Sequence, residues 1–336
     1  MNRTLVRLLV EREEKLREGH GIEWRITGVA SRRLGWIANS TGLDAKILCA
    51  SEHNVSSGLS RDVANRLTSS ASVNDWLTAS KADVLFEATS LNVENGQPAI
   101  DHVRAALEYG AHAITANKGP VVYAYEELLR LANLKGRRFL FESTVMDGVP
   151  IFALFRDNLP TVDLKAFRGI LNSTTNVILS GMEQGLSFEQ SLAKAQKLGV
   201  AETDASHDID GWDASVKVAA LATVLMGTPL KPHEVKREGI RGISPKSVKA
   251  AHESGFCYKL VCRCTRTKEG VSATVAPERL PLSDPLAQVT GTSSVICFET
   301  DIFPELVITE HNPGLEATAY GMLSDFVRAV GNQTGC

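Results

Sequence analysis

Residues 84–115 read VLFEATSLNVENGQPAIDHVRAALEYGAHAIT. Short apolar runs rich in β-forming residues open and close this stretch, Val84–Ala88 and His112–Thr115. Between them, Ala99–Tyr109 carries apolar residues at helical spacing, and Pro98 stands where proline is favoured in a first helical turn. A strand, a helix and a second strand in this order predict two parallel strands with the helix packed on their face.

The same alternation continues on both sides of this unit. Three more runs are expected to be strands: Arg25–Ala30, Ala45–Leu48 and Arg138–Phe141. Three more stretches are expected to be helices: an amphipathic one from Asn2 onward, Asn74–Thr78 and Tyr123–Leu134. The first half is therefore predicted to be α/β, with a doubly wound, Rossmann-like parallel sheet.

Such sheets bind nucleotides at the carboxyl ends of their strands, with a Gly-x-Gly-x-x-Gly loop between the first strand and the first helix. Here the chain opens directly in a helix, so the sheet is expected to lack its first strand and that loop. Either the native chain starts upstream of Met1, or the cofactor site is altered.

The second half has a different order of elements. A strand is expected at Leu164–Leu171, followed by helices and then by several strands between Cys257 and Glu310. The helices are expected at Thr174–Gln184, at Ser187–Leu198 and from Trp212. This predicts an α+β domain with an antiparallel or mixed sheet. A last helix, Ala317–Ala329, is expected to pack back on the first domain, so the predicted limits are 1–135 completed by 311–336, and 136–310.

Composition excludes several classes of protein. The 336 residues suggest two domains, and 43% hydrophobic and 22% charged residues with a net charge of -3 are typical of an ordinary globular protein, which excludes disordered and fibrous classes. Basic residues are dispersed, so no nucleic-acid partner is expected. The longest apolar run, near Val218–Met226, is less than half of the roughly 20 residues that a membrane span needs. With no signal-peptide core, the prediction is a cytoplasmic protein without a membrane partner.

Cysteine spacing supports the same location. The spacings match neither a zinc site nor a dense disulfide framework, which favours small core residues for most of Cys49, Cys257, Cys262, Cys264, Cys297 and Cys336.

The stretch Gly199–Lys217 concentrates the chemistry. Its five carboxylates precede an otherwise apolar helix, Val216–Met226. Asp213 and Lys217 are four residues apart and share one face of that helix. Charges on a buried helix are costly unless they are paired or used, so the pair indicates a functional site. The alternatives are a purely structural ion pair and, for Asp210, a helix cap.

With these residues and four further motifs, the sequence resembles homoserine dehydrogenase. The motifs occur in the family's order and spacing over nearly the whole chain, as Thr115–Pro120, Glu142–Pro150, Gly169–Asn176, Gly199–Lys217 and Pro313–Gly321. The resemblance implies reversible oxidation of L-homoserine to L-aspartate 4-semialdehyde with NAD or NADP, on the route to threonine and methionine. It also implies a small-molecule substrate and a homodimer built through the second domain.

The resemblance assigns roles to several side chains. Lys217 and Lys118 are the candidates for proton transfer, which requires a lysine whose pKa falls toward neutrality through burial or a nearby cation. Asp213 orients Lys217, whereas Glu202 and Asp208 hold the substrate's ammonium. Thr174 and the backbone of Ser173 contact its polar groups. The alternative for Lys118 is a surface lysine in a turn.

Cofactor and cation residues follow from the same resemblance. Thr89, Ser90 and Lys118, with Gly314 and Thr318, are expected to line the cofactor cleft, although Thr-Ser and Pro-Gly are also ordinary turn residues.

Arg32 follows a predicted strand, at a position where a carboxylate would favour NAD. An arginine there favours NADP instead. The alternative is an exposed arginine in a loop. A monovalent cation, Na⁺ or K⁺, is implied at Glu142 and the backbone carbonyls of Val145, Asp147 and Val149. The alternative for Glu142 is a strand-end carboxylate in contact with water.

Three departures from the family pattern keep other functions open. The glycine-rich loop is missing, Val200 replaces a common tyrosine, and little chain follows the last helix, so no regulatory domain and no feedback by threonine are expected. One alternative is a binding or regulatory protein with lost or altered dinucleotide binding. The other is a dehydrogenase for another small hydroxy or amino acid.

Overall fold

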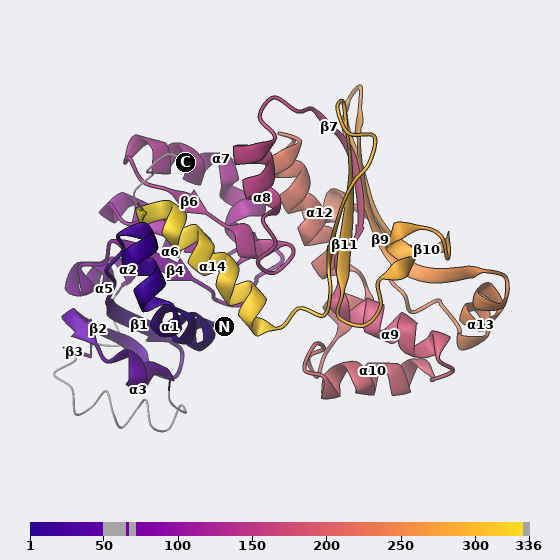
Figure 1. Cartoon of the computed structure of the whole chain (residues 1–336), viewed down its shortest axis with the longest axis horizontal. Coiled ribbons are helices and arrows are strands. Elements are labelled where there is room, and N and C mark those ends of the chain that lie inside the picture. Colours follow the sequence, from indigo (N-terminus) through magenta and orange to yellow (C-terminus); the bar gives the residue numbers. More distant parts are fainter. Residues whose placement is uncertain (50–64, 67–71, 332–336) are drawn as a thin grey trace. The chain divides into compact units, whose positions relative to one another are not determined.

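The computed structural model describes residues 1–49, 65–66 and 72–331, which fall into two compact units (Figure 1). Unit 1 comprises Met1–Val149 and Gly314–Cys336, and unit 2 comprises Pro150–Pro313. Contacts thus group residues 136–149 with unit 1, whereas the limits expected from the sequence place them in the second domain.

A parallel sheet of three strands lies in unit 1, in the order β4-β5-β6. Its strands are β4 Val84–Glu87, β5 His112–Thr115 and β6 Phe139–Leu140. The connecting helices are α6, Ala99–Tyr109, and α7, Lys118–Leu134. The predicted strand, helix and strand of residues 84–115 are therefore confirmed. Helix α7 begins before the predicted Tyr123, because Asn117 caps it, and it is kinked at Ala124.

A second, antiparallel sheet in unit 1 contains β1 Ile26–Ser31, β2 Gly35–Leu43 and β3 Asn65–Arg66. The prediction that the first of these runs joins the parallel sheet is wrong. Its connection to β2 is a tight turn in which the Ser31 hydroxyl accepts from the Leu34 N–H at 3.0 Å. A parallel partner would need a crossover of a dozen or more residues.

The strand predicted at Ala45–Leu48 is also wrong, since Ala45–Cys49 forms helix α3. The Asp44 carboxylate accepts from the Lys46 N–H at 2.7 Å, and the Asp44 carbonyl accepts from the Leu48 N–H at 3.2 Å. These two hydrogen bonds start a helical turn. Leu48 is buried with Ile37 and Leu43, so the apolar run packs as a helix.

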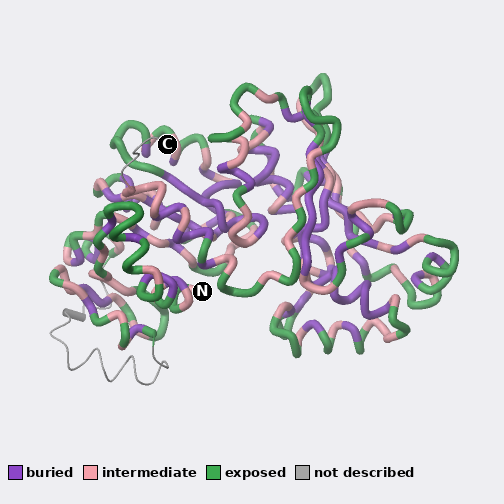
Figure 2. The backbone as a smooth tube through the Cα atoms, viewed as in Figure 1, coloured by how far each residue is buried: buried purple, intermediate pink, exposed green. Residues whose placement is uncertain are grey.

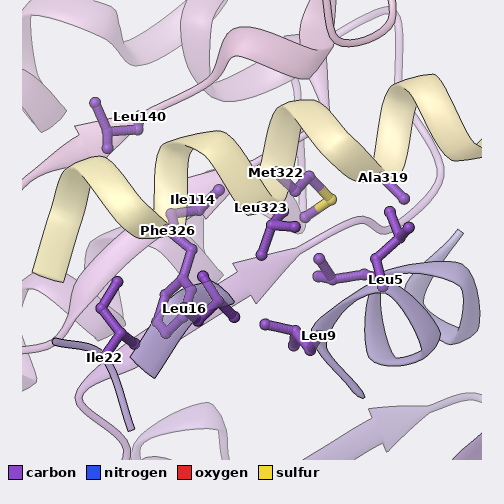
Figure 3. Packing of buried hydrophobic residues seen from close by; sticks show 11 residues of the cluster. Leu5, Leu9, Leu16, Ile22, Ile114, Leu140, Ala319, Met322, Leu323 and Phe326 are labelled. Atoms are coloured by element: carbon purple, nitrogen blue, oxygen red, sulfur yellow. The ribbon is translucent and has the colours of Figure 1, made fainter. Parts of the chain in front are cut away.

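Four more helices lie in the described residues of unit 1: α1 Asn2–Glu11, α2 Glu13–His20, α5 Val73–Ser80 and α14 Leu315–Val330. A short 3-10 turn, η1, covers Glu142–Thr144. Figure 3 shows side chains of α14, among them Met322 and Leu323, pointing toward Leu5 and Leu9 of α1. The last helix thus packs on unit 1, as expected, and buries the apolar face of the first helix.

Unit 2 contains a mixed sheet of six strands in the order β12-β11-β7-β9-β10-β8. The strands are β7 Leu164–Ile170, β8 Lys236–Arg237, β9 Phe256–Thr267, β10 Gly270–Pro281, β11 Ser294–Thr300 and β12 Leu306–Glu310. Only the β8–β10 pair is parallel, among the described strands of this sheet. The central strands are mostly buried in Figure 2, which agrees with the predicted α+β domain.

Helices α9, α12 and α13 contact β9 of this sheet. The helical elements of unit 2 are α8 Ile151–Ala153, η2 Leu154–Asn158, α9 Ser173–Glu183, α10 Phe188–Lys197, α11 Ser206–Ile209, α12 Trp212–Leu225, η3 Pro232–Glu234, α13 Pro245–Glu253 and η4 Pro285–Gln288. None of the helices in the described ranges combines the length and the apolar character that a membrane span requires.

Cysteines in the described residues are free thiols, four buried and Cys49 exposed. Cys336 lies outside the described residues. The alternative role of Asp210 as a helix cap is excluded, because Gly211 is the N-cap of α12 and no side chain caps it. The Asp210 carboxylate instead accepts two hydrogen bonds from Arg241.

Candidate functional site

A strand-to-helix corner in unit 2 carries the first polar group of the site. Strand β7 ends at Ile170 and α9 begins at Ser173, so Asn172 is the N-cap and its Oδ1 accepts from the Thr175 N–H at 2.9 Å. Its Nδ2 donates to Asp208 Oδ1 at 2.7 Å and to Asp213 Oδ2 at 3.1 Å. One buried amide therefore holds two carboxylates that come from two other helices.

Lys217 and Asp213 form the ion pair that their spacing predicts. Lys217 Nζ lies 3.2 Å from Asp213 Oδ2, and the two side chains are 16% and 22% exposed. The same Nζ donates to the Leu171 carbonyl at 2.5 Å. Burial raises the pKa of the nearby Cys262 thiol to about 12, so this thiol stays protonated. Asp213 and the Leu171 carbonyl together hold Lys217 Nζ beside the corner between β7 and α9.

Asp208 is the third member of the cluster. Its Oδ2 lies 2.9 Å from the Thr174 hydroxyl, which also lies 2.8 Å from the Val200 carbonyl. One hydroxyl has one proton, so it cannot donate to both acceptors. A protonated Asp208 resolves this, because it can donate to Thr174 Oγ1 while Thr174 donates to Val200.

The electrostatics of Asp208 act in the same direction. Burial, followed by the negative charge of Asp213, raises the pKa of the Asp208 carboxyl above its ordinary value. Hydrogen bonds from Asn172 and Thr174 and the charge of Lys217 lower it. A cation placed beside Asp208 would favour its ionised form.

Two other predicted residues have different surroundings. The Ser173 hydroxyl donates to the Thr292 carbonyl at 3.1 Å. Ser173 is the first residue of α9, so its backbone lies in the first turn. Glu202 is exposed, and its backbone carbonyl accepts from Gln196 Nε2 at 3.3 Å. The structure therefore joins Asp208, Asp213, Lys217 and Thr174 through hydrogen bonds and an ion pair, while the Glu202 side chain is exposed.

In unit 1, the carboxyl ends of β4 and β5 are joined by Glu87, a residue that the sequence did not single out. This buried carboxylate accepts from the Thr89 N–H at 2.8 Å and from the Thr115 hydroxyl at 2.7 Å. It also accepts from the Thr89 hydroxyl. The two donors of Thr89 therefore fix the start of the loop that follows β4, and the Thr115 hydroxyl ties Glu87 to β5.

Asn117 ties the same loop to the start of α7. Its Nδ2 donates to the carbonyls of Thr89 at 3.0 Å and Ser90 at 3.3 Å, and its Oδ1 accepts from the Gly119 N–H at 2.8 Å. Lys118 is the first residue of α7. Thr89, Ser90 and Lys118 are thus brought together at the edge where parallel sheets bind nucleotides.

Comparison with known families agrees with this arrangement. The family profile described as homoserine dehydrogenase matches residues 150–327. The profile described as the NAD binding domain of homoserine dehydrogenase matches residues 4–142. The NAD(+)-dependent homoserine dehydrogenase of Pseudomonas canavaninivorans is 33% identical over 333 residues, which cover 97% of this chain and 92% of that protein.

This chain belongs to the homoserine dehydrogenase family. The homoserine dehydrogenase of Methanocaldococcus jannaschii is 34% identical over 324 residues, covering 96% of this chain and 94% of that protein. A putative homoserine dehydrogenase of Archaeoglobus fulgidus has a similar structure, with a TM-score of 0.83 and 29% identity over 98% of this chain and 96% of that one.

A hyperthermophilic archaeal homoserine dehydrogenase in complex with NADPH is also similar, with a TM-score of 0.81 and 28% identity over 98% of this chain and 94% of that one. Residues 4–142, which make up most of unit 1, are therefore the NAD binding domain of a homoserine dehydrogenase fold.

The remaining predicted cofactor residues of this homoserine dehydrogenase fold lie at two places in unit 1. Arg32 is exposed in the turn between β1 and β2. Gly314 is the N-cap of α14, and Thr318 follows in its first turns. The Thr318 hydroxyl donates to Asp147 Oδ1 at 2.5 Å, and its carbonyl accepts from the Ser143 hydroxyl at 2.7 Å. Helix α14 is thereby fastened to the segment that carries the implied cation ligands.

The implied cation ligands are oxygen atoms, which suit a hard cation. Glu142 is buried, so the alternative of a strand-end carboxylate in contact with water is wrong. Its Oε2 lies 3.8 Å from Arg328 Nη1, so a positive charge already faces this carboxylate. Among the described residues, no three His, Cys, Asp or Glu side chains gather as a metal site. A cation here would depend on backbone carbonyls for most of its ligands.

Proposed function

We propose that this chain oxidises L-homoserine to L-aspartate 4-semialdehyde, and catalyses the reverse, with NAD or NADP. The reaction belongs to threonine and methionine biosynthesis. The observation that carries the proposal is the position of Lys217 Nζ, held by Asp213 and the Leu171 carbonyl beside Asp208. A base, a partner that orients it and a carboxylate for an ammonium are the groups that a hydroxy amino acid requires.

Lys217 is proposed to move the proton of the reacting oxygen. As the neutral amine it accepts the hydroxyl proton, and the Asp213 carboxylate then stabilises the ammonium that forms. In the reverse direction the ammonium returns this proton to the aldehyde oxygen. Lys118, at the start of α7, is proposed as the second lysine in proton transfer.

The substrate's ammonium is proposed to pair with Asp208 and Glu202. Pairing with the ammonium favours the ionised form of Asp208, which opposes the effect of burial. The Thr174 hydroxyl then donates to the Asp208 carboxylate, and the Ser173 backbone contacts the substrate's polar groups. Asn172 keeps the carboxylates of Asp208 and Asp213 at their spacing.

NAD or NADP fits the edge of unit 1, because Glu87 and Asn117 fix the loop that follows β4. When bound, the nicotinamide supplies the acceptor for the hydride of the substrate's hydroxyl-bearing carbon. The residues that would hold the dinucleotide are Thr89, Ser90, Lys118, Gly314 and Thr318. Arg32 is proposed to favour the 2′-phosphate of NADP.

The test is an assay of the purified chain for homoserine-dependent reduction of NAD and NADP. Turnover with L-homoserine, and none with L-serine or 4-hydroxybutyrate, is expected. Oxidation of another hydroxy acid in preference to homoserine would replace the proposed substrate, and no turnover with either cofactor would overturn the activity. Arg32→Ala is expected to raise the KM for NADP roughly tenfold and to leave that for NAD unchanged.

Three further properties are proposed. Na⁺ or K⁺ binds at Glu142 and at the carbonyls of Val145, Asp147 and Val149, outside the proton-transfer steps. The chain forms a homodimer through unit 2, supported by exposed apolar residues on and before its edge strand β12, such as Ile302 and Val307. Sedimentation equilibrium tests the dimer. The free thiols support a reducing, cytoplasmic location.

A further inference from the structure

A segment outside the proposed catalytic residues, Lys236–Arg241, lies against the turn that joins α11 to α12. Strand β8 pairs parallel with β10, and the Glu238 N–H donates to the Val275 carbonyl at 2.8 Å. The Ile240 N–H then donates to the Ile209 carbonyl at 2.9 Å. The segment therefore connects the sheet edge to this turn through backbone hydrogen bonds.

Gly239 brings the two backbones into direct contact. A Cβ at this position would lie 2.5 Å from the Ile209 carbonyl oxygen and 2.7 Å from Asp210 Cα. Both atoms belong to the backbone, so neither can rotate away as a side chain would. Any residue larger than glycine must displace the turn or the segment.

Two arginines of the segment hold the same turn. Arg241 donates to both carboxylate oxygens of Asp210, at 2.5 and 3.1 Å. The Arg237 guanidinium lies 3.9 Å from the centre of the Trp212 ring and donates to the Asp210 carbonyl. Gly211, between them, has a φ of 79°, which favours glycine. The turn is thus held at its backbone, its carboxylate and its ring.

This turn sets the distance between two carboxylates of the site. Asp208 precedes it in α11, Asp213 follows it in α12, and both accept from Asn172 Nδ2. We infer that residues 236–241, with Gly239 at their centre, are a positioning element that fixes Asp208 relative to Asp213 and Lys217. The inference rests on the proposed oxidation of homoserine.

Stability alone does not account for these contacts. The Arg241–Asp210 pair lies at the surface, with Arg241 exposed and Asp210 half-buried, and ion pairs in contact with solvent contribute little to folding. Helix α12 is anchored by its buried apolar residues, among them Val216, Val218 and Leu221. A displaced turn would therefore leave the fold intact and move carboxylates whose separation the reaction requires.

The test compares Gly239→Ala with Gly242→Ala, a matched control at which a Cβ would meet nothing within 4 Å. Gly239→Ala is expected to lower kcat about 100-fold and to leave the KM for NAD(P) unchanged. Gly242→Ala is expected to match the wild type in both. Wild-type kcat in folded Gly239→Ala, or an equal loss in both variants, would overturn the inference.

A second measurement separates this inference from the proposed activity. The pKa of Asp208, followed by ¹³C NMR of the carboxyl, is expected to change in Gly239→Ala and not in Gly242→Ala. This readout needs no turnover, so it holds even if the wild type does not oxidise homoserine. Unchanged titration in both variants would count against the positioning role.

Arg241 covers the case in which Gly239→Ala does not fold. Arg241→Ala is expected to lower kcat several-fold, and Arg241→Lys to restore part of it, because a lysine keeps the charge without the paired hydrogen bonds. Equal kcat in wild type and Arg241→Ala, with an unchanged pKa of Asp208, would also contradict the inference.

Discussion

Carboxylates join neighbouring elements in both units, but the one in unit 1 is buried, those in unit 2 are half-buried, and their surroundings differ. In unit 1, Glu87 accepts from one backbone N–H and two threonine hydroxyls, all neutral groups. In unit 2, Asp208 and Asp213 share the amide of Asn172, and one ammonium, that of Lys217, lies beside them. The Glu87 carboxylate is thus hydrogen-bonded by neutral donors, whereas in unit 2 the carboxylates of Asp208 and Asp213 lie beside the ammonium of Lys217.

This difference separates a scaffold from a reactive site. Glu87 fixes the loop after β4, whose backbone can contact a cofactor. Its carboxylate accepts hydrogen bonds from Thr89 and Thr115 of the protein itself. Burial, followed by the negative charge of Asp213, raises the pKa of the Asp208 carboxyl, and an incoming ammonium would relieve the repulsion between the two carboxylates. Substitutions in the cluster of unit 2 should therefore change turnover or the KM for homoserine, and substitutions that move the loop held by Glu87 and Asn117 in unit 1 should change cofactor affinity.

Lys217→Ala gives the largest expected effect. Removing the proton-transfer group should lower kcat about 10³-fold, in the range that such groups contribute. The fold should persist, because the rest of α12 is buried through apolar side chains. Steady-state kinetics and circular dichroism measure both quantities.

Lys249→Ala is the control for this change. Lys249 forms the same i,i+4 kind of pair, with Glu253 at 3.9 Å, but both side chains are exposed. Its loss should leave kcat unchanged. Near-normal kcat in Lys217→Ala would exclude Lys217 as the proton-transfer group.

Asp208→Asn should raise the KM for homoserine roughly 10- to 100-fold, because a charge-assisted contact to the ammonium is lost. In the wild type this KM should rise as the pH falls through the raised pKa of Asp208, since the protonated acid pairs poorly with an ammonium. Asp208→Asn should lack that rise. Initial rates across the pH range give both results.

The pH dependence of the free energy of unfolding tests the raised pKa of Asp208 independently of turnover. The folded pKa of Asp208 lies above the unfolded value, so its contribution is present below the unfolded pKa and is lost as pH rises through the folded pKa. The free energy of unfolding of Asp208→Asn should lack this loss. Asp204→Asn is the control, because Asp204 is exposed and its pKa is lowered by Ser206. Identical pH dependence in wild type and Asp208→Asn would contradict the raised pKa.

What the sequence could predict depended on how far apart the interacting residues lie. Residues 84–115 and the Asp213–Lys217 pair follow from local spacing. The shared amide of Asn172 joins residues 36 and 41 positions away, and Glu87 reaches Thr115 across 28 positions, so no local pattern reveals them.

The error at Ala45–Leu48 and the open alternative at Asp210 both arose from short motifs that fit two structures. A brief apolar run fits a strand or a helix turn, and an acid before a helix fits a cap or an ion pair. The capping position of Asn172, between a strand and a polar helix start, was a signal that could have identified Asn172 as a further member of the site.

Gly119→Ala tests the role of unit 1. A Cβ at Gly119 would lie 2.7 Å from Gly96 Cα, so the start of α7 must move away from the loop that contains Gly96. The KM for NAD(P) should rise roughly tenfold, equivalent to ~1.4 kcal/mol, while kcat at saturating cofactor changes less. Gly19→Ala, where a Cβ meets nothing within 4 Å, should leave both unchanged. A loss confined to kcat would show that the two units do not divide these tasks.

Exchange of the monovalent cation gives the smallest expected effect. Replacing choline chloride with KCl or NaCl at equal ionic strength should raise the Tm by about 2 °C, because a bound cation stabilises the folded state. The effect is small since Arg328 already faces Glu142. Arg328→Gln should enlarge it, because the buried carboxylate then needs another positive charge. Arg137→Gln, at an exposed turn, should not. Equal Tm values in all three salts for the wild type and for Arg328→Gln would exclude a cation at Glu142. The Glu142 carboxylate would then be balanced in the wild type by Arg328 and not by a bound ion.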